Sequence, residues 1–298
     1  MRQGNARVWA GALAIVGLGG ASTGARAVVV RQVTVERVGE GVISTGRNET
    51  FPVEDPMDGS LWFSVYDQSF DQQTIMRAAR GDGTWVTPET APFSGRWGDR
   101  APRFSPDGDR LYFTSNRPMR GSAPGDMNVW MTERRRDGWS EPVPLPAPVN
   151  GEARDMHVAA TASALYFASN RPGGAGLSDV YRVAGDPVGG GSADRPAGRV
   201  NDAHSQPDLW VSPDESWMIL VVTDHPEGLG GDDLFVLRRT ADGWSAPRHL
   251  AAPINTDEYE YGPSISADGE WLYFTSHRGG SGDIYRVRLR AAGLPPGR

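Results

Sequence analysis

The sequence repeats itself about every 53 residues. The segment SPDGDRLYFTSNR at 105–117 returns as SADGEWLYFTSHR at 266–278, and weaker copies occur elsewhere in the chain. One apolar position marks the five copies: Leu61, Leu111, Leu165, Met218 and Leu272. The successive spacings are 50, 54, 53 and 54 residues. A repeat of this length is typical of solenoids and propellers, in which each unit buries its apolar face against its neighbours.

Each repeat predicts four short strands, which we call a, b, c and d. Strand b is an aromatic and β-branched run such as Leu111–Ser115, and it follows a tight turn of the Pro-Asp-Gly type. Strand c is exemplified by Asp283–Val287, and a Gly-Trp turn leads from it into strand d. Prolines 142, 144 and 247 fall in or beside strand d. Proline is tolerated there only if strand d lies at the edge of its sheet.

Four strands per repeat predict an all-β fold, a single β-propeller with five four-stranded blades. The last repeat stops near Arg290 without a strand d, while the extended segment Val28–Ser44 precedes the first repeat. We therefore expect this N-terminal segment to supply the missing strand and close the ring. A six-bladed ring is the alternative, and it would need about 50 further residues that the repeats do not provide.

The first 27 residues are typical of a signal peptide. Arg2 and Arg7 precede a mostly apolar run at 8–18, and Ala25-Arg26-Ala27 has the A-x-A cleavage pattern. The run has 11 residues, which is too short to span a bilayer as a helix. We expect cleavage before Val28, a propeller domain over 28–298, a periplasmic or secreted location and no membrane span. An uncleaved anchor or a buried helix is the alternative.

Composition narrows the functional classes. The chain has no cysteine, which excludes thiol catalysis, disulfide scaffolds and Cys-ligated zinc. Its formal net charge of -7 argues against nucleic acid as a partner. The mature chain carries no H-E-x-x-H, G-x-S-x-G or P-loop motif. The sequence therefore favours a protein that is not an enzyme, with no cofactor.

The repeat resembles that of the TolB-type propellers, a periplasmic family with WD-like repeats. Residues 255–285 follow the family pattern almost throughout, with His277 in place of the usual Asn. Residues 101–130 and 150–182 follow it with gaps. The resemblance implies an exported propeller. It does not extend to the α/β domain that precedes the propeller in TolB itself, so it does not imply the Tol-Pal role.

Two sets of repeated residues are predicted to be structural. Three Arg-Asp pairs are expected to join the ends of the b–c hairpins: Arg117 with Asp126, Arg171 with Asp179, and Arg278 with Asp283. A set of ligand-binding charges is the alternative. The tryptophans of the Gly-Trp turns, Trp139 and Trp244, are expected to pack between blades.

Equivalent polar residues stand at the start of strand a in all five repeats: Glu49, Asp99, Asp155, Gln206 and Glu260. Strand a is innermost in a propeller, so these ring positions should face or flank the mouth of the central channel. They are candidate ligand-binding residues, and capping of backbone N–H groups is the alternative role. Residues nearby depart from the repeat and extend the candidate set: His204, Asp208, Tyr259 and Tyr261, with Arg103, His157, Trp97 and Trp210 on the same segments.

The sequence leaves two functions open. The first is a non-catalytic propeller that binds an envelope protein or glycan through its d–a and b–c loops. The second is a carbohydrate-active hydrolase or lyase with carboxylates at the channel mouth. We expect the Glu260 side of the mouth to suit a cationic group or a sugar hydroxyl better than an anion. A bound cation there would relieve repulsion among the carboxylates.

Overall fold

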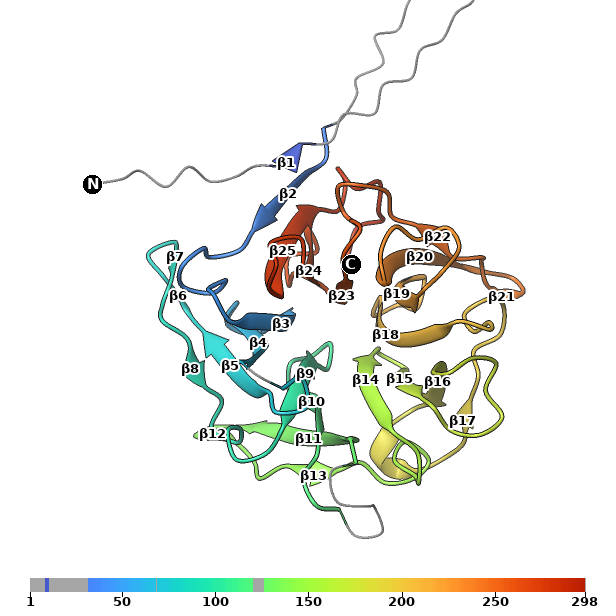
Figure 1. Cartoon of the computed structure of the whole chain (residues 1–298). Helices are drawn as coiled ribbons and strands as arrows, with labels where there is room; N and C mark the ends of the chain where they lie inside the picture. The colour runs from blue at the N-terminus through green and yellow to red at the C-terminus, as the bar shows by residue number, and fades with distance from the viewer. Residues whose placement is uncertain (1–8, 11–31, 68, 120–125, 298) are drawn as a thin grey trace, which may run out of the picture.

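Five antiparallel sheets surround a central axis in the computed structural model (Figure 1). The structure describes residues 9–10, 32–67, 69–119 and 126–297. Each sheet holds one repeat, so the prediction of a five-bladed all-β propeller is confirmed and the six-bladed alternative is wrong. Within the described residues the only helix is the short 3₁₀ turn η1 (Pro187–Gly189). None of the described segments forms a helix able to cross a membrane.

The strands of each blade follow the chain from the inside outward. Blade 1 contains β3 (Asn48–Glu54), β4 (Leu61–Tyr66), β5 (Thr74–Ala78) and β8 (Glu89–Thr90), with the hairpin β6 (Arg80–Gly81) and β7 (Thr84–Trp85) beside it. Blade 2 contains β9 (Asp99–Phe104), β10 (Arg110–Ser115) and β11 (Asn128–Arg135), which pairs with both β12 (Gly138–Trp139) and β13 (Val143–Pro144). Blade 3 contains β14 (Asp155–Ala160), β15 (Ala164–Ser169), β16 (Asp179–Ala184) and β17 (Ala193–Asp194).

The last two blades follow the same plan. Blade 4 contains β18 (Ser205–Val211), β19 (Trp217–Thr223) and β20 (Asp232–Thr240), which pairs with both β21 (Gly243–Trp244) and β22 (Arg248–His249). Blade 5 contains β23 (Glu260–Ile265), β24 (Trp271–Ser276) and β25 (Asp283–Arg288), and its fourth strand is β2 (Thr34–Arg37). In blades 1 to 4 every outer strand has only two residues, and blades 2 and 4 have two such short strands each, as expected for a sheet edge.

The N-terminal segment closes the ring, as predicted. Val35 of β2 lies opposite Val287 of β25, and Arg37 lies opposite Tyr285. The two-residue strand β1 (Trp9–Ala10) pairs with the other edge of β2. Strand β1 falls inside the predicted signal peptide, so cleavage before Val28 would remove it. The rest of the signal-peptide segment lies outside the described residues.

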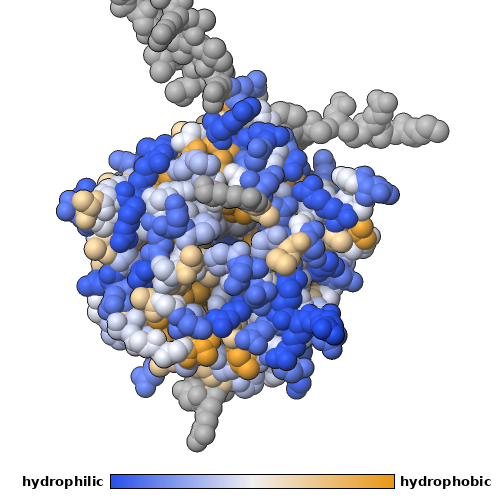
Figure 2. Space-filling view, turned by 180° about the vertical axis from the view of Figure 1, so that it is seen from behind, coloured by the Kyte–Doolittle hydropathy of each residue, from blue (hydrophilic) through white to orange (hydrophobic). Residues whose placement is uncertain are grey.

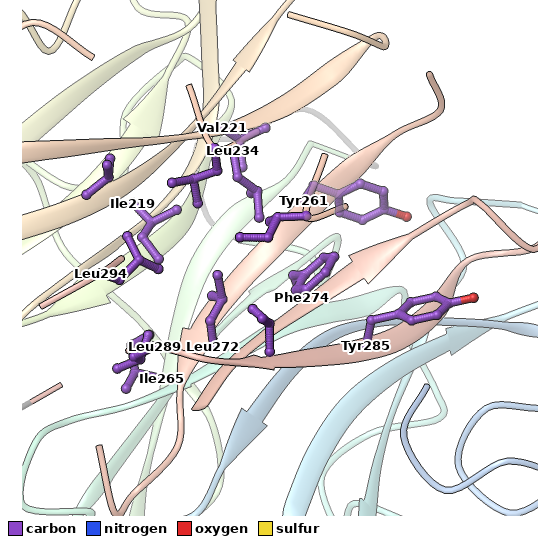
Figure 3. Close-up of a cluster of buried hydrophobic side chains, with 14 of the residues drawn as sticks. Ile219, Val221, Leu234, Tyr261, Ile265, Leu272, Phe274, Tyr285, Leu289 and Leu294 are labelled. Carbon is purple, nitrogen blue, oxygen red and sulfur yellow. The ribbon is translucent and has the colours of Figure 1, made fainter. Parts of the chain in front are cut away.

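The apolar core lies between the blades. Strands of blades 4 and 5 form one cluster in which Val221 and Leu234 face Leu272 and Phe274 (Figure 3). The tryptophans of the Gly-Trp turns pack between blades, as predicted. Trp139 of blade 2 lies 5.7 Å from Trp62 of blade 1, ring centre to ring centre. A sheet with two apolar faces buries both of them only when a neighbouring blade lies on each side, which explains why the repeats form a closed ring.

Candidate functional site

The five ring positions are buried in the structure. Their side chains are 0–2% exposed, and none of them lines the pocket described below. Glu49 accepts hydrogen bonds from the N–H of Thr45 (2.9 Å) and from its hydroxyl (2.5 Å). Glu260 has the same two bonds with Thr256, both 2.7 Å. These carboxylates therefore cap the loop that enters strand a, which is the alternative role that the sequence left open.

The predicted partners of the repeated arginines are wrong. Arg117 pairs with Asp99 (3.1 Å), Arg171 with Asp155 (2.7 Å) and Arg278 with Glu260 (3.5 Å), so each guanidinium meets the ring acid of its own blade. Asp179 instead accepts the backbone N–H groups of Ala175 and Gly176, and Asp283 pairs with Arg37. The end of strand b lies beside the start of strand a, which brings the arginine to the ring acid.

A pocket of about 640 Å³ opens among the d–a loops, the b–c loops and the inner strands. The space-filling view from behind shows a hollow near the middle of the ring (Figure 2). Aromatic rings line much of the pocket: Phe51, Tyr66, Phe70, Tyr259 and Tyr261. Phe51 lies 5.1 Å from Tyr261 and 6.1 Å from Phe70 between ring centres. The Arg100 guanidinium covers Phe70 at 4.7 Å from its centre.

A bulge in each inner strand shapes the pocket wall. Four residues that stand two positions after a ring position have positive φ angles: Phe51 (53°), Ala101 (53°), His157 (45°) and Gly262 (68°). In blades 1 to 3 the N–H of this residue donates to a strand b hydroxyl of the preceding blade, for example from His157 to Thr114 Oγ1 (3.2 Å). Such conformations cost energy in residues other than glycine and need this kind of support.

Blade 4 departs from this pattern, and the departure brings Asp208 into the pocket. The supporting hydroxyl is replaced by Ala168 in blade 3 and by Val221 in blade 4. Asp208 takes over the acceptor role, because its Oδ2 accepts the N–H of Gly262 at 2.8 Å. Its other oxygen accepts the N–H of Leu209 and lies 3.7 Å from the buried Arg103 guanidinium. Burial outweighs these partners and raises the pKa of Asp208 to about 6.

This pKa predicts a pH dependence of stability. The unfolded carboxyl has an ordinary pKa near 3.8, so between pH 4 and 6 the folded state binds the proton more tightly. The contribution of the protonated Asp208 carboxyl to the unfolding free energy is therefore complete at low pH, and it is lost as the pH rises through 6. The wild type should lose about 2.5 kcal/mol of unfolding free energy between pH 4 and 7 relative to Asp208→Asn. Urea unfolding across this range tests it, and parallel profiles for the two proteins would contradict it.

His157 lies on the pocket wall and has one ring nitrogen without a hydrogen-bond partner among the described residues. Its Nδ1 lies 2.8 Å from the carbonyl oxygen of Pro207, which can only accept, so Nδ1 carries the proton. Burial and the nearby Arg100 charge lower the pKa of His157 to about 3, which keeps the ring neutral. Among the described residues, Nε2 is buried without a hydrogen-bond partner, and so is the Ser178 hydroxyl on the same wall.

Asp232 adds a second carboxyl to the pocket. Its Oδ1 accepts the Thr223 hydroxyl at 2.6 Å, and burial raises its pKa. Asp232 and His157 Nε2 are the acceptors on the pocket wall that backbone N–H groups do not occupy. Arg154 and Asp71, 3.9 Å apart, lie on the wall formed by blades 1 and 3.

The structure brings together only part of the candidate set. Asp208, Tyr259 and Tyr261 line the pocket, and so does His157. The ring positions are buried and do not line the pocket: Glu49, Asp99, Asp155, Gln206 and Glu260. His204 lies beside Asp202 and His225, outside the pocket. Sequence reasoning missed Phe51, Phe70 and Asp232. Phe51 stands in register with His157 and Asp208, so the repeat could have identified it, whereas Phe70 lies in a loop outside the repeat.

Comparisons with solved structures agree on the fold. A TolB from Acinetobacter baumannii is 18% identical, with a TM-score of 0.51 over 87% of this chain and 60% of that one. An α-L-arabinofuranosidase from Podospora anserina, solved with cellotriose, is 13% identical, with a TM-score of 0.50 over 84% of this chain and 95% of that one. The chain thus has the propeller fold of TolB and spans 60% of that protein's length. No protein-family model matches the sequence, and no curated protein is significantly similar to it.

Proposed function

We propose that this chain is a binding propeller whose pocket takes a sugar residue of a cell-envelope glycan. The observation that carries the proposal is the pairing of aromatic rings with buried, unpartnered polar atoms in one pocket. Aromatic faces suit the C–H faces of a pyranose, and the His157 Nε2 and Asp232 acceptors suit its hydroxyls. A buried acceptor without a partner is costly, so a donor from a ligand would relieve that cost.

The size of the pocket supports a small ligand or the end of a longer one. A volume of about 640 Å³ falls within the range of small-molecule sites. The signal-peptide pattern and the resemblance to TolB-type propellers support a location in the envelope. A sugar terminus on a larger envelope polymer would reach this pocket through the d–a and b–c loops.

Glycan-array screening of the protein, followed by calorimetry with the best ligand, tests the proposal. Two aromatic side chains at the pocket are partly exposed, Phe70 at 39% and Tyr259 at 49%. Phe70→Ala and Tyr259→Ala should each weaken binding at least tenfold, because each removes apolar contact area. Val143→Ala is the matched control, since Val143 is 49% exposed and lies outside the pocket. Equal affinities for all three variants would contradict the proposal.

The alternative, a carbohydrate-active enzyme, is favoured by one observation. Two carboxyls with raised pKa values, Asp208 and Asp232, line the same pocket, as a general acid and its partner would. Asp208 is committed to backbone N–H groups, which leaves Asp232 as the group able to exchange protons. Release of reducing ends or unsaturated sugars by the wild type, abolished in Asp232→Asn with binding retained, would support the enzyme.

A further inference from the structure

Blade 4 lacks the ion pair that ties its neighbours' loops together. In blades 3 and 5 the arginine after strand b donates to carbonyls of the preceding d–a loop, for example from Arg171 to Pro148 (3.0 Å) and Val149 (2.8 Å). The same guanidinium also forms an ion pair with the ring acid of its own blade. In blade 4, Asp224 stands where the arginine would be and Gln206 stands where the acid would be.

A different cluster occupies this place in blade 4. Asp202 and His204 come from the d–a loop and His225 from the b–c loop, and one ligand atom of each lies within 4.8 Å of the others. The two imidazole rings are 5.0 Å apart between centres, and His204 Nδ1 lies 3.0 Å from Asp202 Oδ1. Ligand atoms around a zinc ion lie about 3–3.5 Å apart, so the cluster would close by about an ångström on binding.

We propose that Asp202, His204 and His225 bind a Zn²⁺ ion, which joins the two loops of blade 4 as the arginine does in blades 3 and 5. Two imidazoles and one carboxylate form a donor set that zinc accepts, with a further position left for water. The site is independent of the pocket proposed for the sugar, since none of its three residues lines that pocket.

The surroundings of Asp202 prepare it as a ligand. Its Oδ1 accepts the His204 backbone N–H (2.9 Å) and the Gln206 side-chain amide (2.8 Å), which fixes the orientation of the carboxylate. Asp202 and His225 both line a groove of about 470 Å³ at the surface, so an ion reaches them from solvent. In the metal-free protein, His225 Nδ1 accepts a hydrogen bond from the Glu227 N–H at 3.1 Å. Coordination of the ion through His225 Nε2 would move the ring proton to Nδ1, so this hydrogen bond would be lost.

Calorimetric titration of the untagged, metal-free protein with ZnCl₂ tests the site. We expect one Zn²⁺ per chain with a micromolar or lower Kd, and a rise in Tm of several degrees at saturating Zn²⁺. His204→Gln and His225→Gln should each weaken binding at least thirtyfold and abolish the rise in Tm. His277→Gln is the matched control, because His277 lies outside the cluster, and it should bind Zn²⁺ as the wild type does.

Three results would overturn the proposal. They are binding below one Zn²⁺ per chain at saturation, wild-type affinity in both histidine variants, or an equal rise in Tm with CaCl₂. The last result would indicate a carboxylate site, because calcium takes oxygen ligands and not imidazole. Unfolding of the metal-free variants at the wild-type Tm would show that the substitutions leave the fold intact.

Discussion

A chain that begins at Thr45 is expected to be largely unfolded at room temperature, so that it shows no cooperative unfolding transition. The removed segment buries three apolar side chains, Val35 (3% exposed), Val38 (3%) and Ile43 (1%). Each contributes about 1.5–3 kcal/mol when fully buried. The segment also carries Arg37, which pairs at 2.6 Å with the buried Asp283. The sum is comparable to the about 5–15 kcal/mol that stabilises a typical domain.

Loss of the segment also exposes an edge of blade 5. Strand β2 covers β25, whose Val287 and Ile284 would otherwise face solvent beside unpaired backbone groups. Circular dichroism during thermal unfolding measures the effect, with a chain that begins at Val28 as the control. A peptide spanning 28–44, added in trans, should restore part of the transition. Equal melting of the two truncated chains would show that ring closure contributes nothing to stability.

The fold could be predicted from the sequence because the same strand pattern occurs five times. The weak copy at 212–218 can be recognised because the strong copies at 105–117 and 266–278 define the pattern of the repeat. Closure of the ring by the N-terminal segment could be predicted by counting strands. The last repeat lacks strand d, so its strand c would otherwise be an uncovered sheet edge. Both arguments depend on periodicity, which is a property of the linear sequence.

The partners of Arg171 could not be found in this way. Asp179 is the nearer acid across the b–c hairpin, but its carboxylate is used by backbone N–H groups of its own loop. Asp155 is the partner because strands a and b pair along their length, which places Ser169 opposite Asp155 and Arg171 just beyond. Pocket residues such as Phe70 and Asp232 were not predicted from the sequence for a related reason. They lie at or beside loops whose lengths differ between repeats, so no register assigns them a place.

The second large effect is expected from loss of the Arg171–Asp155 ion pair. Arg171→Ala removes this pair and should lower the stability of the fold. Asp155 is fully buried, and the guanidinium supplies its 2.7 Å partner as well as donors to Pro148 and Val149. Removal of one member of a buried pair leaves an uncompensated charge, so the unfolding free energy should fall by about 3 kcal/mol. Chemical denaturation measures this loss. Arg288→Ala is the control, because the Arg288–Glu270 pair is exposed and should contribute at most about 1 kcal/mol.

A double-mutant cycle with Asp155→Asn separates the charge from the rest of the arginine. Asparagine retains an acceptor for the Gly151 N–H (2.9 Å in the wild type) but carries no charge that needs compensation. Blade 4 already tolerates an amide at this position, since Gln206 stands there without an arginine. Arg171→Ala should therefore cost at least about 1 kcal/mol less in the Asp155→Asn background than in the wild type. Additive losses would mean that the arginine stabilises the ring through the Pro148 and Val149 carbonyls and its stacking on Phe167, 4.8 Å from the ring centre, and not through the carboxylate.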